Sequence, residues 1–139
     1  MKQKNGFLLF TDLLLGLSLL VLFLGLAFSV FHYQEKKQAV DLTVRELAME
    51  LQYIRQLHVG NNGGILYLYL DENGYKIIRG VNILKTYTYS PLVRGTKGEV
   101  TFDVKGKPKK DMSLSFSSAD GAYERRIVLA AQTGRIRLE

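Results

Sequence analysis

The hydrophobic pattern begins with an unbroken apolar run. Residues 7–31 number 25 and contain a single charged side chain, Asp12. As an α-helix this run is about 37 Å long, which exceeds the roughly 30 Å hydrocarbon core of a bilayer. Eighteen of its residues are Leu, Val or Phe, each of which favours insertion by roughly 0.3 to 0.6 kcal/mol, whereas Asp12 costs at most about 3.5 kcal/mol. The pattern therefore predicts a transmembrane helix over 7–31.

After Phe31 the apolar positions become one-sided. They recur at spacings of four and three, with charged residues between them, at Val40, Val44, Leu47, Leu51 and Ile54. This spacing predicts an amphipathic helix over 32–60 that continues the apolar helix and packs one face on a sheet. The Gly-Asn-Asn-Gly-Gly segment at 60–64 tolerates positive φ, so we expect the helix to end there.

The rest of the chain has the pattern of strands and turns. From residue 65 onwards, β-branched and aromatic residues are separated by Gly, Asn, Asp and Pro. Asn73-Gly74 is typical of a hairpin turn. The alternation in 101–104 (Thr-Phe-Asp-Val) and 113–116 (Ser-Leu-Ser-Phe) indicates sheets with one packed face and one solvated face. The predicted strands are 65–70, 75–79, 83–89, 100–104, 112–117, 123–130 and 135–138.

These elements predict an α+β fold, in which one long N-terminal helix packs on an antiparallel β domain over 61–139. Length and composition agree, because 139 residues with 47% hydrophobic content allow one small domain beyond the apolar run and exclude a multidomain enzyme. The chain has no cysteine, which excludes disulfides, thiol catalysis and cysteine-ligated metals.

The net charge is +6, and the excess lies in the C-terminal half because acids and bases balance over 32–58. A basic half indicates an anionic partner such as nucleic acid or lipid headgroups, unless the lysines only keep the domain soluble.

The N-terminus predicts how the apolar helix is oriented. Lys2 and Lys4 precede it, so the positive-inside tendency places residues 1–6 in the cytoplasm and residues 32–139 outside. The run is too long for an ordinary secretory signal peptide. A plain signal anchor explains the hydrophobicity but gives no reason for a Gly-Phe step directly after a basic tag, or for an acid one turn further on.

Gly6-Phe7 after a basic tag resembles the start of the prepilin-like proteins, the type IV pilins and pseudopilins. The resemblance implies a type IV pilin-like fold and a leader, 1–6, that a prepilin peptidase removes before Phe7, which is then N-methylated. The family usually has Glu as the fifth mature residue, whereas this chain has Thr11 there and Asp12 next. That acid is thought to pair with the terminal amine of a neighbouring subunit, so Thr11 and Asp12 are the expected assembly positions. The departure favours a minor subunit over a bulk filament subunit.

Further blocks resemble the GspH/FimT group and, most closely in pattern, its competence relative ComGD. They are 75–80 (Tyr-Lys-Ile-Ile-Arg-Gly), 100–108 (Val-Thr-Phe-Asp-Val-Lys-Gly-Lys-Pro), 123–129 and the closing 133–137 (Thr-Gly-Arg-Ile-Arg). The order of these blocks, with a leader at the right distance, carries the resemblance. It implies other pilins or pseudopilins as partners and a bacterial cell membrane as the location.

Basic residues form the candidate binding site. Four lysines occupy one turn, at Lys105, Lys107, Lys109 and Lys110. Arg135 and Arg137 lie on one face of the last strand, because side chains alternate. Arginine forks suit phosphates and lysines add positive charge, which indicates double-stranded DNA as a possible partner. The alternative is that the lysines solvate a turn and the arginines protect an edge strand. The Gly-Arg-x-Arg ending resembles the one that DNA-binding members of the FimT group are thought to use.

Nothing in the sequence indicates catalysis, a cofactor or a metal site. His32 and His58 lie at opposite ends of the amphipathic helix. We expect His32 to be an interfacial residue and His58 to be a partner of the helix dipole at the C-terminal end. Five tyrosines could form a stacking platform, but aromatic residues in strands more often pack in the core. They are Tyr67, Tyr69, Tyr75, Tyr87 and Tyr89.

The sequence supports three hypotheses of function. The first is a minor pilin-like subunit of a DNA-uptake filament. The second is a GspH-like pseudopilin of type II secretion, whose basic surface contacts neighbouring subunits. The third is a single-pass anchored binding domain that does not polymerise and keeps its leader.

Overall fold

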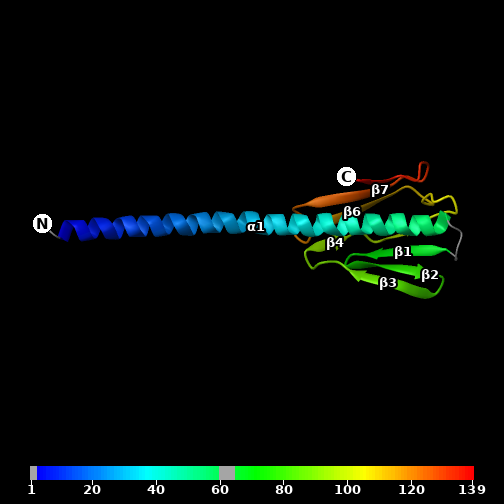
Figure 1. The fold of residues 1–139 in the computed structure, drawn as a ribbon, viewed down its shortest axis with the longest axis horizontal. Helices are drawn as coiled ribbons and strands as arrows, with labels where there is room; N and C mark the ends of the chain where they lie inside the picture. The colour runs from blue at the N-terminus through cyan, green and yellow to red at the C-terminus, as the bar shows by residue number, and fades with distance from the viewer. Residues whose placement is uncertain (1–2, 60–64) are drawn as a thin grey trace. The chain divides into compact units, whose positions relative to one another are not determined.

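The computed structural model describes residues 3–59 and 65–139, so the predicted end of the helix at 60–64 lies outside the described residues. One helix, α1 (Gln3–Val59), precedes all the strands (Figure 1). The chain divides into two compact units, Met1–Glu35 and Lys36–Glu139. The predicted α+β architecture is confirmed.

The first unit is helical throughout its described residues, and its apolar side chains are exposed. Every Leu, Val and Phe between Phe7 and Phe31 has about half or more of its surface exposed. Among the described residues, α1 is the one helix long and apolar enough to cross a membrane. Exposed Leu, Val and Phe side chains along a helix of this length are typical of a helix that contacts lipid or other helices.

In the second unit, α1 buries the stripe that the spacing predicted. Val40, Val44, Leu47, Leu51 and Ile54 are each at most 3% exposed. They pack with inward-facing residues of the strands in one core, which includes Leu68, Tyr75, Phe102, Phe116 and Ile127. Burying a side chain of this size contributes roughly 1.5 to 3 kcal/mol, so this face of α1 holds helix and strands together.

The described strands form two antiparallel sheets of four strands each. The first has the order β3-β2-β1-β5, built from β1 (Leu66–Asp71), β2 (Gly74–Arg79), β3 (Asn82–Thr88) and β5 (Gly98–Thr101). The second has the order β4-β6-β7-β8, built from β4 (Val93–Gly95), β6 (Met112–Ser118), β7 (Glu124–Leu129) and β8 (Ile136–Leu138). Figure 1 shows β1, β2 and β3 together in green, apart from β6 and β7.

Two details differ from the predicted strands. The short strand β4 was not predicted, because Val93-Arg94-Gly95 is too brief to show an alternation. The predicted strand 100–104 was too long, because β5 ends at Thr101 and a turn follows. Phe102 is buried as the alternation indicated, but Val104 is 71% exposed. The turn breaks the alternation because Gly106, at φ +73°, reverses the chain two residues later.

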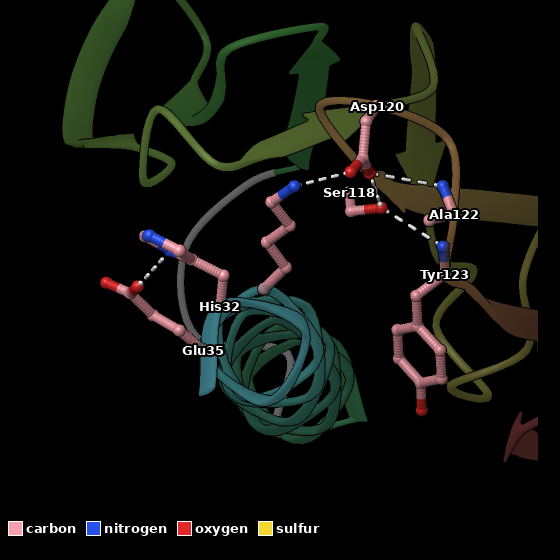
Figure 2. Close-up of polar contacts among 7 residues, drawn as sticks. His32, Glu35, Ser118, Asp120, Ala122 and Tyr123 are labelled. Atoms are coloured by element: carbon pink, nitrogen blue, oxygen red, sulfur yellow. Dashed lines mark hydrogen bonds and ion pairs between the residues drawn. The ribbon is translucent and has the colours of Figure 1, made fainter. Parts of the chain in front are cut away.

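Polar contacts tie α1 to the turn between β6 and β7. Asp120 accepts hydrogen bonds from the Ser118 hydroxyl and the Ala122 N–H, as Figure 2 shows, and it also pairs with Lys36. The Lys36 ammonium is the main reason that the pKa of Asp120 lies well below its usual range. This turn is therefore held to the beginning of the second unit by one charged contact.

His58 has a different role from the predicted one. The ring is buried, and Nδ1 lies 2.9 Å from the Ile54 carbonyl oxygen while the Leu66 N–H donates to Nε2 at 3.2 Å. Because Nε2 accepts, the proton is on Nδ1, and the ring is a neutral donor to Ile54. A neutral ring is no charged partner of the helix dipole, and His58 instead joins the end of α1 to the beginning of β1. His32 lies near Glu35 within α1, with Nδ1 3.5 Å from Oε2 (Figure 2).

The tyrosines divide between core and surface. Tyr75 stacks on Tyr87 with ring centroids 5.1 Å apart, and Tyr89 meets Phe116 edge-on at 5.8 Å. Burial raises the pKa of both the Tyr75 and the Tyr89 phenols above the usual value. Tyr69 instead is about half exposed. The core interpretation is therefore correct for Tyr75 and Tyr89 and wrong for Tyr69.

Candidate nucleic-acid interface

The two predicted arginines line one groove with the last turns of α1. The groove has a volume of about 590 Å³ and is lined by Gln52, Arg55, Gln56, Val59, Arg135, Ile136 and Arg137. Arg135 and Arg137 follow each other at a spacing of two along the edge of the second sheet, with the half-buried Ile136 between them. The lining thus contains three guanidinium groups, two amides and no carboxylate.

Arg55, which lines the groove, was not among the residues predicted from the sequence. On a helix it looks like one more solvated charge, but in the fold its half-buried side chain lies between two turns. A Cβ atom on Gly106 would come within 3.2 Å of Arg55 Cγ and Nε, and one on Gly134 within 3.5 Å of an Arg55 terminal nitrogen. Both glycines have positive φ, at +73° and +66°. The two glycine turns therefore leave the space that the Arg55 side chain occupies.

The turn over 103–107 brings one of the four predicted lysines, Lys107, toward this groove, and no contact among the described residues places Lys105 there. Asp103 Oδ1 accepts the backbone N–H groups of Lys105 and Lys107 at 2.9 and 2.7 Å, which closes the turn. Lys107 then donates from Nζ to the Gln132 carbonyl at 2.9 Å, and its Cγ lies near Gly134 as Arg55 does. Lys107 is therefore beside the groove, with its ammonium attached to a neutral acceptor.

Lys109 and Lys110 belong to a different depression. They line a smaller one of about 270 Å³, together with Glu99, Met112 and Leu129. The six predicted residues thus do not form one patch. Arg135 and Arg137 share the groove with Arg55, Lys107 lies beside it, and Lys109 and Lys110 face another part of the surface next to a carboxylate.

The arginines of the groove differ from Arg125 and Arg126 in their partners. Arg125 bonds to the Tyr123 hydroxyl and the Asp41 carboxylate, which raise its pKa, and Arg126 pairs with Glu124 at 2.9 Å. Within residues 3–59 and 65–139, none of the three groove arginines forms a salt bridge. Three guanidinium groups without carboxylate partners around one concave surface supply the charge and the paired N–H donors that suit an anion with several oxygens, such as a phosphate chain.

The other candidate residues lie on α1 in the first unit. The Thr11 hydroxyl donates to the backbone carbonyls of Phe7 and Leu8, at 3.1 and 2.8 Å. Thr11 is thus satisfied within its own helix, while Asp12 is exposed on the helix surface with no salt bridge to any other described residue. Gly6 and Phe7 lie inside α1, which begins at Gln3. Among the residues that the structure describes, no group of three or more His, Asp or Glu side chains could hold a metal ion.

The chain was compared with known proteins. No protein-family model matches it, and no curated protein matches it. Among solved structures, it is similar to the type IV minor pilin FimU of Pseudomonas aeruginosa in two crystal forms. The TM-scores are 0.50 and 0.55, at 20% and 19% identity, over 74% of this chain and 91% and 90% of the FimU chain. The fold is therefore type IV pilin-like, as the leader and strand blocks predicted.

Proposed function

We propose that the chain is a minor pilin-like subunit of a type IV filament-type machine, and that it binds double-stranded DNA through the groove of Arg55, Arg135 and Arg137. The likeness to FimU supports the first half, because a shared fold of helix and sheets suits the same kind of assembly. The exposed apolar residues over 7–31 support a subunit that is held in the bacterial cell membrane, N-terminus inside, before it joins a filament.

The observation that carries DNA binding is the set of three arginines without carboxylate partners in one groove. Duplex DNA carries one negative charge per roughly 1.7 Å of axis, so neighbouring guanidinium groups can contact successive phosphates. Nothing in the groove resembles a helix that reads bases in the major groove, so we expect binding independent of sequence. Gln52 and Gln56 add neutral donors to phosphate oxygens along the same side of α1.

The test is a titration of labelled duplex DNA with the full-length chain in detergent micelles, followed by fluorescence anisotropy at several salt concentrations. Three phosphate contacts predict a log-log salt slope of roughly −3, and non-specific affinity in the range of about 1 to 100 micromolar. Each of Arg55→Ala, Arg135→Ala and Arg137→Ala should make the slope shallower by about 0.9.

Two variants serve as matched controls. Arg126→Ala removes an exposed arginine that Glu124 already neutralises, and it should leave the slope unchanged. Replacing Lys109 and Lys110 together should lower DNA affinity less than replacing any single groove arginine, because these lysines line another depression. If Arg126→Ala and Arg55→Ala lower DNA affinity equally, the effect is one of overall charge and the groove is not the binding site. No binding at low salt would favour the second hypothesis, a type II secretion pseudopilin whose groove contacts other subunits.

The same proposal includes processing and assembly at the N-terminus. A prepilin peptidase removes residues 1–6 before Phe7, and Asp12 then pairs with a subunit amine in the filament, with Thr11 beside it. Asp12 supports this role because a carboxylate in an apolar helix is costly to keep without a partner. The helical position of Phe7 does not oppose cleavage, because a short exposed helix end unwinds at little cost.

A further inference from the structure

The outer edge of β3 is unusually apolar and open. β3 is the last strand of its sheet, and within the part of the chain that the structure describes no strand pairs with its other side. Ile83 is 58% exposed and Leu84 52%, and Val81 in the turn before β3 is 96% exposed. Natural edge strands are normally protected by charges, Pro, bulges or a very short length. β3 has seven residues, Lys85 as its one charged side chain and one bulge at Leu84, so its stretch from Lys85 to Thr88 stays regular.

Backbone groups on this edge point outward. The Tyr89 N–H donates to the Asn73 carbonyl at 2.8 Å, which makes these two residues a hydrogen-bonded pair at the end of the β2–β3 ladder. Hydrogen-bonded and non-hydrogen-bonded pairs alternate in an antiparallel ladder. The Lys76–Thr86 and Gly74–Thr88 pairs are therefore non-hydrogen-bonded, so the N–H and C=O groups of Thr86 and Thr88 point away from β2.

A depression lies on each face of the sheet beside this edge. On the outer face, one of about 510 Å³ is lined by residues that include Tyr69, Lys76, Ile78 and Thr86. On the face toward α1, one of about 450 Å³ is lined by residues that include Met49, Tyr53, Leu57, Arg79 and Leu84. Ile77 pairs with Lys85 and Ile78 with Ile83, so Leu84 is an extra residue in β3, and this bulge lets Leu84 and Lys85 both reach the α1 side.

An open edge with a depression on each face is what an added strand requires. Main-chain hydrogen bonds to the edge supply affinity, and alternate side chains of the added strand enter the two depressions. We propose that β3 receives an extended strand of another polypeptide, with apolar residues on both faces and a carboxylate beside Arg79. This surface is separate from the DNA groove, and the inference goes beyond the proposed function.

The charges favour this occupant over a second copy of the chain. On the α1 side, Glu50 neutralises Lys85, which leaves Arg79 without a salt bridge to any other described residue. On the outer side, Lys76 and Asp71 balance each other in number. A second β3 offers no carboxylate, because its sequence is Asn-Ile-Leu-Lys-Thr-Tyr-Thr. β5, the other edge of the sheet, contains Glu99 but has only four residues, too few to cover the seven of β3. A longer strand, with an acid on the α1 side, matches the excess charge there.

The experiment uses fluorescence anisotropy of a labelled, acetylated and amidated peptide, Val-Thr-Glu-Val-Val-Thr-Val, with the full-length chain in detergent micelles. It should bind saturably, and the peptide with Lys in place of Glu should bind about tenfold more weakly. Arg79→Glu should reverse that preference, whereas Lys110→Glu, on another part of the surface, should not. Methyl groups on the amide nitrogens that face β3 should reduce binding about tenfold or more, because they remove the donors to the edge.

Thr86→Pro should have the same effect as the methylated peptide, since the Thr86 N–H is not used by β2. It should leave DNA binding unchanged, which separates this test from that of the groove. Binding that does not saturate by about 1 mM, or that is unaffected by methylation of the peptide, overturns the proposal. Self-association of the chain that Thr86→Pro abolishes also overturns it, because it would make a second copy the occupant.

Discussion

The contact of His58 with two backbone groups makes a quantitative prediction about stability. His58→Leu keeps a side chain of similar size against Phe102, whose ring centroid lies 6.1 Å from that of His58. It removes the acceptor of the Leu66 N–H and the donor to the Ile54 carbonyl. Leu66 is only 2% exposed, so its N–H is left without a partner in the core.

The size of the effect follows from these contacts. A buried donor without a partner costs about 1 to 3 kcal/mol. Ile54 lies within the helix, so its carbonyl keeps its backbone hydrogen bond. The loss of the second bond, to the His58 ring, therefore adds little to the destabilisation. We therefore expect His58→Leu to lower the free energy of unfolding of the second unit by about 2 kcal/mol. For a domain of about 100 residues this corresponds to a fall in Tm of about 10 °C.

The assay is thermal unfolding of the full-length chain in detergent, followed by near-ultraviolet circular dichroism of the tyrosines, with amide hydrogen exchange as a local measure. Exchange at Leu66 should accelerate more than exchange in β6 and β7, because the contact is at the end of α1 and the beginning of β1. His32→Leu is the matched control, since His32 is exposed in the first unit and should leave Tm unchanged. A His58→Leu protein that unfolds within about 2 °C of the wild type, with Leu66 still protected, would refute the reasoning.

Four further predictions concern single side chains. Tyr89→Phe should raise the free energy of unfolding by about 1 kcal/mol in denaturant titrations, because the buried Tyr89 hydroxyl has no partner among the described residues. Tyr87→Phe should lower the free energy of unfolding by a similar amount, because it removes the hydrogen bond from the Tyr87 hydroxyl to the Glu46 carboxylate. Mass spectrometry of the native protein should find a chain that begins at a methylated Phe7, and an intact first residue in cells with the peptidase would contradict cleavage. Asp12→Ala should leave membrane insertion intact or improve it and should reduce crosslinking to partner pilins, and unchanged crosslinking would rule out the assembly role. Asp120→Asn should destabilise the chain by a constant amount above about pH 5, and the difference should shrink as pH falls below about 4, because a carboxyl with a lowered pKa contributes its full stability above the pKa of the unfolded form and loses it progressively as pH falls toward the folded-state pKa.

The sequence predicted most reliably what depends on local periodicity. The buried stripe from Val40 to Ile54 was correct at every position, because burial of a helix face repeats with the helix period whatever the face packs on. The hairpin predicted at Asn73-Gly74 is present, but its two turn residues are Glu72 and Asn73, and Gly74 already belongs to β2 and pairs with Asp71. The prediction that the strand continued to Val104 was wrong, because one glycine turn interrupts an alternation that is only four residues long.

The candidate binding groove could be predicted only in part, because it depends on contacts between distant segments. Arg135 and Arg137 share a face through strand alternation, which the sequence contains. Their meeting with Arg55 depends on where β8 lies against α1, which no local pattern specifies. One signal was available, because residues 52, 55, 56 and 59 adjoin on one side of a helix and none of them is acidic.

In the second unit, α1 presents three different faces, and the helical period explains why they do not overlap. The core stripe that includes Leu51 and Ile54 is buried, Arg55 and Val59 line the arginine groove, and Glu50 and Leu57 line the depression beside β3. At about 100° per residue, the last two sets fall on opposite flanks of the buried stripe. A substitution on one flank need not disturb the other or the core. Losses of DNA binding and of strand binding should therefore be separable. In a double variant of Arg55 and Tyr53, the loss of affinity for each ligand should equal the loss in the corresponding single variant.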